Sequence, residues 1–215
     1  MIIRVHNKVF CVIVPQKCGI SSVTNILGYP ITGEIISKSR TRRILKKKNH
    51  LYHIGNTLDI ELSFAKENDI SIDYLYAVVR DPLDRFISAY KDRILKKDTD
   101  GFGDKSLSFA IENLPTLISS ETDFGLHARP QSHWLGNSIA IYDKVFDTRD
   151  LNKTFKPLVE KAANVSIPQM RENVSDDAIN IELTPEQKKY LQTFYSSDYA
   201  LLEQVRSEGL YDEYR

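Results

Sequence analysis

Two continuous runs of apolar residues predict the strongest strands of the chain. Residues 9–14 (VFCVIV) and 74–79 (YLYAVV) are rich in β-branched and aromatic side chains and do not alternate with polar ones. Such runs are typical of strands that are buried on both faces of a parallel sheet. Weaker patterns predict further strands at residues 50–54 and 139–146.

The clearest helix signal follows residues 74–79. Asp81 is a suitable capping residue, and Pro82 would occupy the first helical position, where its missing N–H is not needed. The apolar residues that follow share one helix face: Leu83, Phe86, Ile87, Tyr90 and Ile94. Further helices are predicted at 21–27, 58–67, 106–119 (interrupted by Pro115) and 151–163, and from a capping box formed by Thr184 and Gln187.

Strands that alternate with helices predict an α/β fold, with a P-loop-like central parallel β-sheet flanked by helices on both faces. A length of 215 residues suits a single domain, 1–215. Ligands of such sheets bind at the carboxyl ends of the strands. We therefore expect the chemistry in the loops that follow residues 9–14 and 74–79.

Composition narrows the class of protein. The 29 Lys and Arg balance 29 Asp and Glu, whereas a general nucleic-acid binder would usually be more basic. No apolar run is long enough to span a membrane, and no secretory signal is present, so we expect a cytoplasmic protein. Cys11 and Cys18 are expected to be free thiols, and no cluster of cysteines or histidines predicts a metal site.

The first loop, PQKCGISS, has the features of an anion site. Backbone N–H groups at the start of a helix favour an anion, and Lys17 would add a positive charge. Gly19 permits a tight turn, while Ser21 and Ser22 supply hydroxyl groups. Taken alone, the loop is equally consistent with a polar turn that carries a surface lysine.

The second loop, within VVRDPLDRFISAY, places Arg80 at the end of a strand and Ser88 two turns into the following helix. An arginine there can make a forked contact with a phosphate. The alternative is a local salt bridge with Asp81 or Asp84. For Arg85 we favour that alternative.

Together the two loops resemble the sulfotransferases that use 3′-phosphoadenosine 5′-phosphosulfate (PAPS), and most closely the carbohydrate sulfotransferase branch. The first matches the family pattern PK-x-G/A-x-[ST]-[ST], with Gln16 inserted between proline and lysine. The resemblance implies that this segment binds the 5′-phosphosulfate through Lys17, Cys18, Gly19, Ser21 and Ser22.

The second loop matches the family pattern VR-[DN]-P-x-x-R-x-x-S-x-Y with every spacing kept, from Val79 to Tyr90. The resemblance implies that Arg80 and Ser88 hold the 3′-phosphate. HARPQSHWLG (127–136) resembles a family segment with an H-x-x-PQ pattern. IPQMRENVS (167–175) resembles a loop that closes on the nucleotide, which implies Arg171 as a further donor contact.

The implied reaction moves a sulfuryl group in line from PAPS to a hydroxyl of a carbohydrate or glycan, releasing adenosine 3′,5′-bisphosphate without a metal. Catalysis would rest mainly on positioning and charge stabilisation. Lys17 would neutralise the leaving phosphate. His53 is the preferred base, because its segment resembles that of uronyl 2-O-sulfotransferases; His127 is the second candidate and Glu61 a more remote one.

The segment 38–48 (KSRTRRILKKK) holds seven Lys or Arg in eleven positions. A solvated helix face or loop is the favoured interpretation, and a surface for an anionic acceptor is the other. Two further functions stay open: a P-loop kinase or NTPase, and a non-catalytic sulfotransferase fold that binds a polyanion. Against the kinase, Lys17 is followed by Cys18 and not by Ser or Thr.

Overall fold

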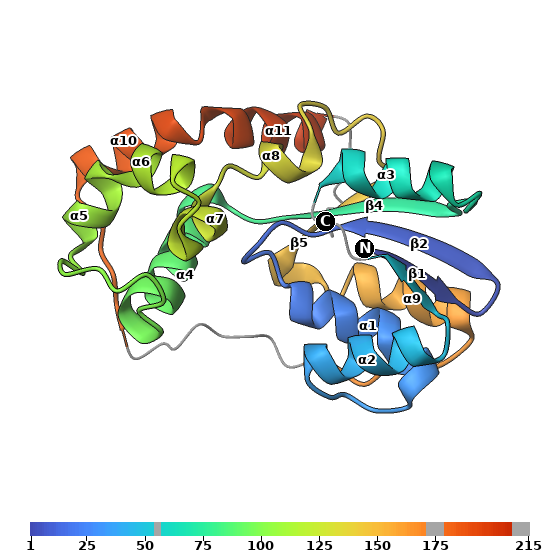
Figure 1. Cartoon of the computed structure of the whole chain (residues 1–215). Helices are drawn as coiled ribbons and strands as arrows, with labels where there is room; N and C mark the ends of the chain where they lie inside the picture. Colours follow the sequence, from blue (N-terminus) through green and yellow to red (C-terminus); the bar gives the residue numbers. More distant parts are fainter. Residues whose placement is uncertain (54–56, 171–178, 208–215) are drawn as a thin grey trace.

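One five-stranded sheet forms the centre of the protein. The computed structural model describes residues 1–53, 57–170 and 179–207. The strands lie in the order β3-β1-β2-β4-β5, with helices on both sides of the sheet, so the predicted α/β class is confirmed (Figure 1). Their bounds are Ile2–Val5 (β1), Lys8–Ile13 (β2), Leu51–His53 (β3), Tyr74–Val79 (β4) and Lys144–Asp147 (β5).

The sheet is mixed, whereas a parallel one was predicted. Strands β2, β4 and β5 are parallel, but β1 pairs antiparallel with both β2 and β3. The sequence pattern missed β1, a strand of four residues. Only His6 and Asn7 separate it from β2, and a two-residue turn joins antiparallel neighbours. His6 takes a positive φ of 53° in this turn.

Alternate residues of each strand enter two separate cores. On one face, Phe10 and Val12 of β2 pack with α1 (Ile20–Thr32), α2 (Lys38–Lys47) and α9 (Phe155–Ala163). On the other, Cys11 and Ile13 pack with α3 (Leu58–Glu67), α8 (Ser132–Leu135) and α11 (Ser196–Ser207). Burial on both faces explains why the strand is apolar throughout.

A helical lobe lies beyond the carboxyl ends of the parallel strands (Figure 1). It is built around Phe86, Phe124 and Tyr195, all fully buried. Its helices are α4 (Pro82–Tyr90), α5 (Leu107–Glu112), α6 (Leu114–Ser119), α7 (Asp123–Ala128) and α10 (Pro185–Phe194). As predicted, the Asp81 side chain caps α4, and Thr184 and Gln187 form a capping box. None of the helices in the described part of the chain combines the length and apolar character that crossing a bilayer requires.

The bounds of several predicted elements differ from those observed, and two of these differences have a clear structural cause. The predicted helix at 106–119 is two helices, α5 and α6, which meet at Asn113, and Pro115 lies in the first turn of the second. The predicted strand at 139–146 was wrong in its first half, where Ile139 and Tyr142 form a turn. Their side chains are buried against α8 and α11, so packing and not strand pairing accounts for their apolar character.

Candidate active site

The loop after β2 delivers the amino end of α1 to the carboxyl edge of the sheet. Gly19 is the N-cap residue, with φ 77°, and no side chain caps this helix. The first N–H groups of α1 therefore have no partner within the helix, and the positive end of its dipole is available to an anion. A Cβ at Gly19 would lie 3.1 Å from Leu151 Cδ1 and 3.2 Å from Thr148 Cγ2, so a side chain here would crowd its neighbours.

The extra residue Gln16 is accommodated by a tight turn. The N–H of Cys18 donates to the carbonyl of Pro15 at 3.1 Å, and Lys17 takes a positive φ of 66°. Despite this insertion, Lys17 lines the cavity at the sheet edge.

The structure corrects the expected role of Cys18. Its side chain is fully buried, and Sγ lies 3.3 Å from Gln131 Oε1. Burial raises the pKa of this thiol to about 12, so it stays protonated. The N–H of Cys18 is bonded to the Pro15 carbonyl, and its side chain packs in the core. Cys18 therefore offers neither its N–H nor its thiol to a ligand in the cavity.

A cavity of about 720 Å³ lies between the two loops. Its lining includes most of the residues that the sequence predicted for donor binding: Lys17, Gly19, Ser21, Ser22, Arg80 and Ser88. His127, the second candidate base, also lines it. Loops that are about 60 residues apart in the sequence thus meet at one site.

The cavity is strongly basic although the chain as a whole is neutral. Eight Lys or Arg residues line it against two acidic residues, Asp84 and Asp92. They come from the first loop, α2, the strand ends and the helix that follows Arg80: Lys17, Lys38, Arg80, Lys91, Arg93, Lys96, Lys97 and Arg149. Such a concentration of positive charge in a concave site attracts an anionic ligand.

Gln131, which the sequence interpretation did not assign, joins the two loops. Its amide accepts from the N–H of Arg80 at 2.9 Å and donates to the Arg80 carbonyl at 2.8 Å. Its oxygen also accepts from Cys18. Arg80 Nη1 in turn donates to the carbonyl of Lys17 at 3.1 Å. Gln131 of the HARPQ segment therefore fixes the relative position of the two predicted phosphate loops.

The favoured local salt bridge of Arg85 was wrong. The Arg85 side chain is fully buried, and Nη1 donates to the carbonyl of His127 at 2.9 Å. Nη2 donates to the carbonyls of Ala128 and Arg129 and lies 3.9 Å from Asp198 Oδ2. Through these hydrogen bonds Arg85 connects α4 to the end of α7 and to the HARPQ segment. The spacing of the motif did not indicate that this arginine is buried.

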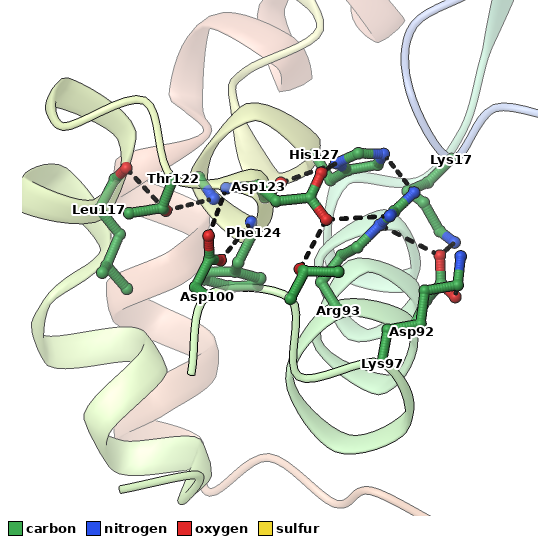
Figure 2. Close-up of polar contacts among 12 residues, drawn as sticks. Lys17, Asp92, Arg93, Lys97, Asp100, Leu117, Thr122, Asp123, Phe124 and His127 are labelled. Atoms are coloured by element: carbon green, nitrogen blue, oxygen red, sulfur yellow. Dashed lines mark hydrogen bonds and ion pairs between the residues drawn. The ribbon is translucent and has the colours of Figure 1, made fainter. Parts of the chain in front are cut away.

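Lys17 is held by a carboxylate from the helix that follows Ser88 (Figure 2). Its Nζ lies 2.8 Å from Asp92 Oδ2, and Lys97 Nζ lies 3.1 Å from Oδ1 of the same carboxylate. Arg93 Nε is 3.3 Å from Oδ2. Burial alone would raise the pKa of Asp92, but the bonds and charges of these cations overcome it and lower the pKa to about 2.

Comparison with known families agrees with this geometry. A family model described as the sulfotransferase family matches residues 1–203. The chain belongs to the sulfotransferase family. No curated protein matches the chain. Arg171, the remaining donor contact predicted for this sulfotransferase, lies outside the described residues.

The two histidines considered as bases occupy different places in the sulfotransferase. His127 lies in the cavity with both ring nitrogens engaged: Nδ1 is 2.7 Å from the Asp123 carbonyl, and Nε2 is 2.7 Å from Arg93 Nη2 (Figure 2). A carbonyl only accepts and a guanidinium only donates, so the proton lies on Nδ1. Burial lowers the pKa of His127, and the charges of Arg93 and Lys17 lower it further.

His53 ends β3 and is not among the residues that line the cavity. Its Nδ1 lies 3.1 Å from Oε2 of the fully buried Glu61, and its ring stacks on Phe64 with the ring centroids 4.1 Å apart. Glu61 also accepts from the amino group of Met1. With Nδ1 donating to the carboxylate, the acceptor position of the ring is Nε2. The structure thus pairs two of the three groups considered as bases.

The basic segment 38–48 of the sulfotransferase is largely the solvated helix that was favoured, α2. Two of its basic residues depart from that description. Lys38 lines the cavity. Arg42, one turn later, has Nε and Nη2 buried without a hydrogen-bond partner in the described part of the chain. Within the same residues, His, Cys, Asp and Glu side chains form no group of three or more that could hold a metal ion.

Proposed function

We propose that this sulfotransferase moves the sulfuryl group of PAPS to a hydroxyl of a carbohydrate. One observation carries the proposal: a single basic cavity contains two separate groups of residues that are suited to bind an anion, the α1 amino end with Lys17 and the pair of Arg80 and Ser88. PAPS has an anionic group at each end of its ribose, and two such places suit it. The cavity volume of about 720 Å³ is also in the range of nucleotide-sized ligand sites.

We assign the donor a definite direction in the cavity. The first N–H groups of α1, with Lys17, Ser21 and Ser22, would hold the 5′-phosphosulfate. Arg80 and Ser88 would hold the 3′-phosphate. Leu151 and Met170 also line the cavity, and they offer an apolar surface for the adenine ring.

The transfer itself is an in-line displacement. The acceptor oxygen attacks the sulfur and forms the new S–O bond, while the bond from sulfur to the 5′-phosphate oxygen breaks. The acceptor proton passes to the base, and adenosine 3′,5′-bisphosphate leaves. Negative charge grows on the leaving phosphate, which is where Lys17 and the α1 dipole are most effective.

For the base we propose His53, oriented by Glu61. A carboxylate that accepts from Nδ1 fixes the tautomer and leaves Nε2 as the nitrogen that can accept a proton, as in other acid–base sites. His127 suits this role less well because its Nε2 lone pair already accepts from Arg93. We assign His127 to the donor side of the cavity, together with Arg93.

For the acceptor we propose a carbohydrate that carries carboxylate or sulfate groups. Lys38 faces the cavity, and the buried guanidinium nitrogens of Arg42 have no hydrogen-bond partner among the described residues. A buried polar group without a partner is costly, and an anionic ligand would satisfy it. The single-domain organisation and the cytoplasmic location stay predictions from the sequence.

Transfer of labelled sulfate from PAPS to a panel of neutral and acidic glycans tests the proposal. We expect labelled product from acidic glycans without added metal, and a much smaller yield from neutral ones. Asp69→Asn is a suitable control, because Asp69 is exposed and precedes β4 at the opposite end of the strands. Absence of labelled product from every acceptor would contradict a catalytic role and favour a binding protein.

A further inference from the structure

The carboxylate of Asp92 is the acidic group bonded to the Lys17 ammonium. The two side chains are partly buried, with 18% and 22% of their surfaces exposed, and both line the donor cavity. Asp92 also contacts Arg93 and Lys97, so one carboxylate lies among three cations (Figure 2). From this central position the Asp92 carboxylate can orient the three cationic side chains and stabilise their charged forms.

A change in helix type accompanies this arrangement. After Tyr90 the chain continues as a π-helical segment, η1 (Lys91–Lys96), and the N–H of Lys97 donates to the Asp92 carbonyl five residues back at 3.2 Å. Three consecutive residues, Lys91, Asp92 and Arg93, all line the cavity. Short π segments of this kind are found mostly at functional sites.

Charged and titratable groups from several elements surround Lys17. Arg93 approaches from the η1 segment and Lys97 from the residue directly after it. Lys38 approaches from α2 and His127 from α7, and the Arg80 guanidinium donates to the Lys17 carbonyl. Burial lowers the pKa of Lys17, and Arg93 and Lys97 lower it further, while the hydrogen bond and charge of Asp92 raise it. Removing Asp92 would leave a half-buried ammonium among cations.

We propose that Asp92 is a positioning residue that aims the Lys17 ammonium at the leaving phosphate and keeps it charged. The inference rests on the proposed function, since it assigns Lys17 to the phosphate released from PAPS. The Asp92 carboxylate and the donor phosphate both accept from the Lys17 ammonium. Because both favour its charged form, Lys17 stays protonated while the S–O bond breaks. An interaction that strengthens as charge develops on the leaving group raises kcat more than it lowers KM.

The kinetic test compares Asp92→Asn with Asp92→Glu between pH 6 and pH 9.5. We expect Asp92→Asn to lower kcat at pH 8 by about 10- to 100-fold with a smaller change in donor KM. The activity should also be lost at a lower pH than in the wild-type protein, because the Lys17 ammonium deprotonates sooner. Asp92→Glu should restore most of kcat, and Asp69→Asn should match the wild type.

A second readout needs no activity. Acetic anhydride modifies only the neutral amine, so mass spectrometry of the acetylated Lys17 peptide across pH reports the protonation of that lysine. We expect the midpoint to move to lower pH in Asp92→Asn and to higher pH in Lys97→Met, which removes a competing cation. The opposite directions separate an electrostatic effect from a general loss of structure.

Two results would overturn the inference. One is a labelling midpoint for Lys17 that is the same in wild type, Asp92→Asn and Lys97→Met. The other is a uniform loss of kcat at every pH in Asp92→Asn that Asp92→Glu does not restore. A wild-type protein that transfers no sulfate but shows the expected labelling shifts would instead contradict the proposed function, and leave the Asp92–Lys17 interaction standing.

Discussion

His127 and His53 lie in contrasting surroundings. His127 is in the basic cavity, nearly buried, with Nε2 facing a guanidinium. His53 is at the end of an edge strand, partly exposed, with Nδ1 facing a buried carboxylate. One histidine has the favourable position next to Lys17, and the other has the surroundings that make an imidazole a base.

The difference is the reason why we propose His53, and not the cavity residue His127, as the base. A neighbouring cation makes protonation of an imidazole unfavourable, whereas a carboxylate stabilises the imidazolium that forms when a proton is accepted. In the proposed mechanism the basic cavity holds the anionic donor, and the base acts on the acceptor from outside that cavity. Substitutions at the two histidines and at the cavity residues test this division.

His53→Gln is expected to have the largest effect. Loss of a general base typically lowers the rate by about 10²- to 10⁴-fold, and glutamine cannot take the proton. Affinity for adenosine 3′,5′-bisphosphate should not change, because His53 does not line the cavity. Single-turnover rates and calorimetric binding would measure both quantities. A His53→Gln protein with nearly full activity would end the assignment of this histidine as the base.

Lys17→Met should come next, with kcat lower by about 10²- to 10³-fold, the cost of removing one donor that stabilises transition-state charge. Methionine keeps much of the length of the side chain without its charge. The same assay with Lys46→Met, an exposed lysine on α2, is the matched control. Full activity of Lys17→Met would show that the inserted Gln16 has turned the lysine away from the reaction.

Arg80→Ala should weaken binding rather than catalysis. A charged hydrogen bond to the 3′-phosphate contributes about 1.5–3 kcal/mol, so donor KM should rise by about 10- to 150-fold. The variant should also lose the preference for PAPS over adenosine 5′-phosphosulfate, which lacks the 3′-phosphate. If the variant and the wild type preferred PAPS over adenosine 5′-phosphosulfate to the same extent, Arg80 would not be the residue that binds the 3′-phosphate.

His127→Gln should have the smallest effect, a loss in kcat of less than about tenfold, since Nε2 makes a structural bond and is not the proton acceptor. Burial keeps the pKa of His127 below its ordinary value, so the side chain is already neutral at pH 7. The acidic limb of the pH–rate profile should therefore stay where it is in the wild type. A loss as large as that of His53→Gln, or a displaced limb, would reverse the roles of the two histidines.

The sequence predicted the elements whose local pattern of apolar residues is consistent with only one type of secondary structure. The strand Tyr74–Val79 and the helix Leu58–Glu67 have the predicted bounds, because a run buried on both faces and an amphipathic segment are local signals. The predicted strand at 139–146 was partly wrong because turn residues can also be apolar when helices cover them.

The candidate site was predictable only as far as the two motifs reach. They identified the loops that line the cavity, but not the contacts that join them. Gln131 is 113 residues from Cys18, and Asp92 is 75 residues from Lys17, so no periodicity or spacing connects either pair. Arg80 and Arg85 belong to one motif, yet Arg80 lines the cavity whereas Arg85 is buried. The burial of Arg85 depends on its packing against α7, which the motif does not reveal.

Thermal unfolding with adenosine 3′,5′-bisphosphate, measured without magnesium, tests most directly whether the cavity is a PAPS site. A ligand that binds only the folded protein raises its stability, by about 2.7 kcal/mol at one hundred times Kd. We expect a raised Tm with the bisphosphate, a smaller rise for Arg80→Ala and no rise with ATP and magnesium. Stabilisation by ATP and magnesium but not by the bisphosphate would contradict the assignment of PAPS as the donor. It would instead indicate a P-loop kinase or NTPase.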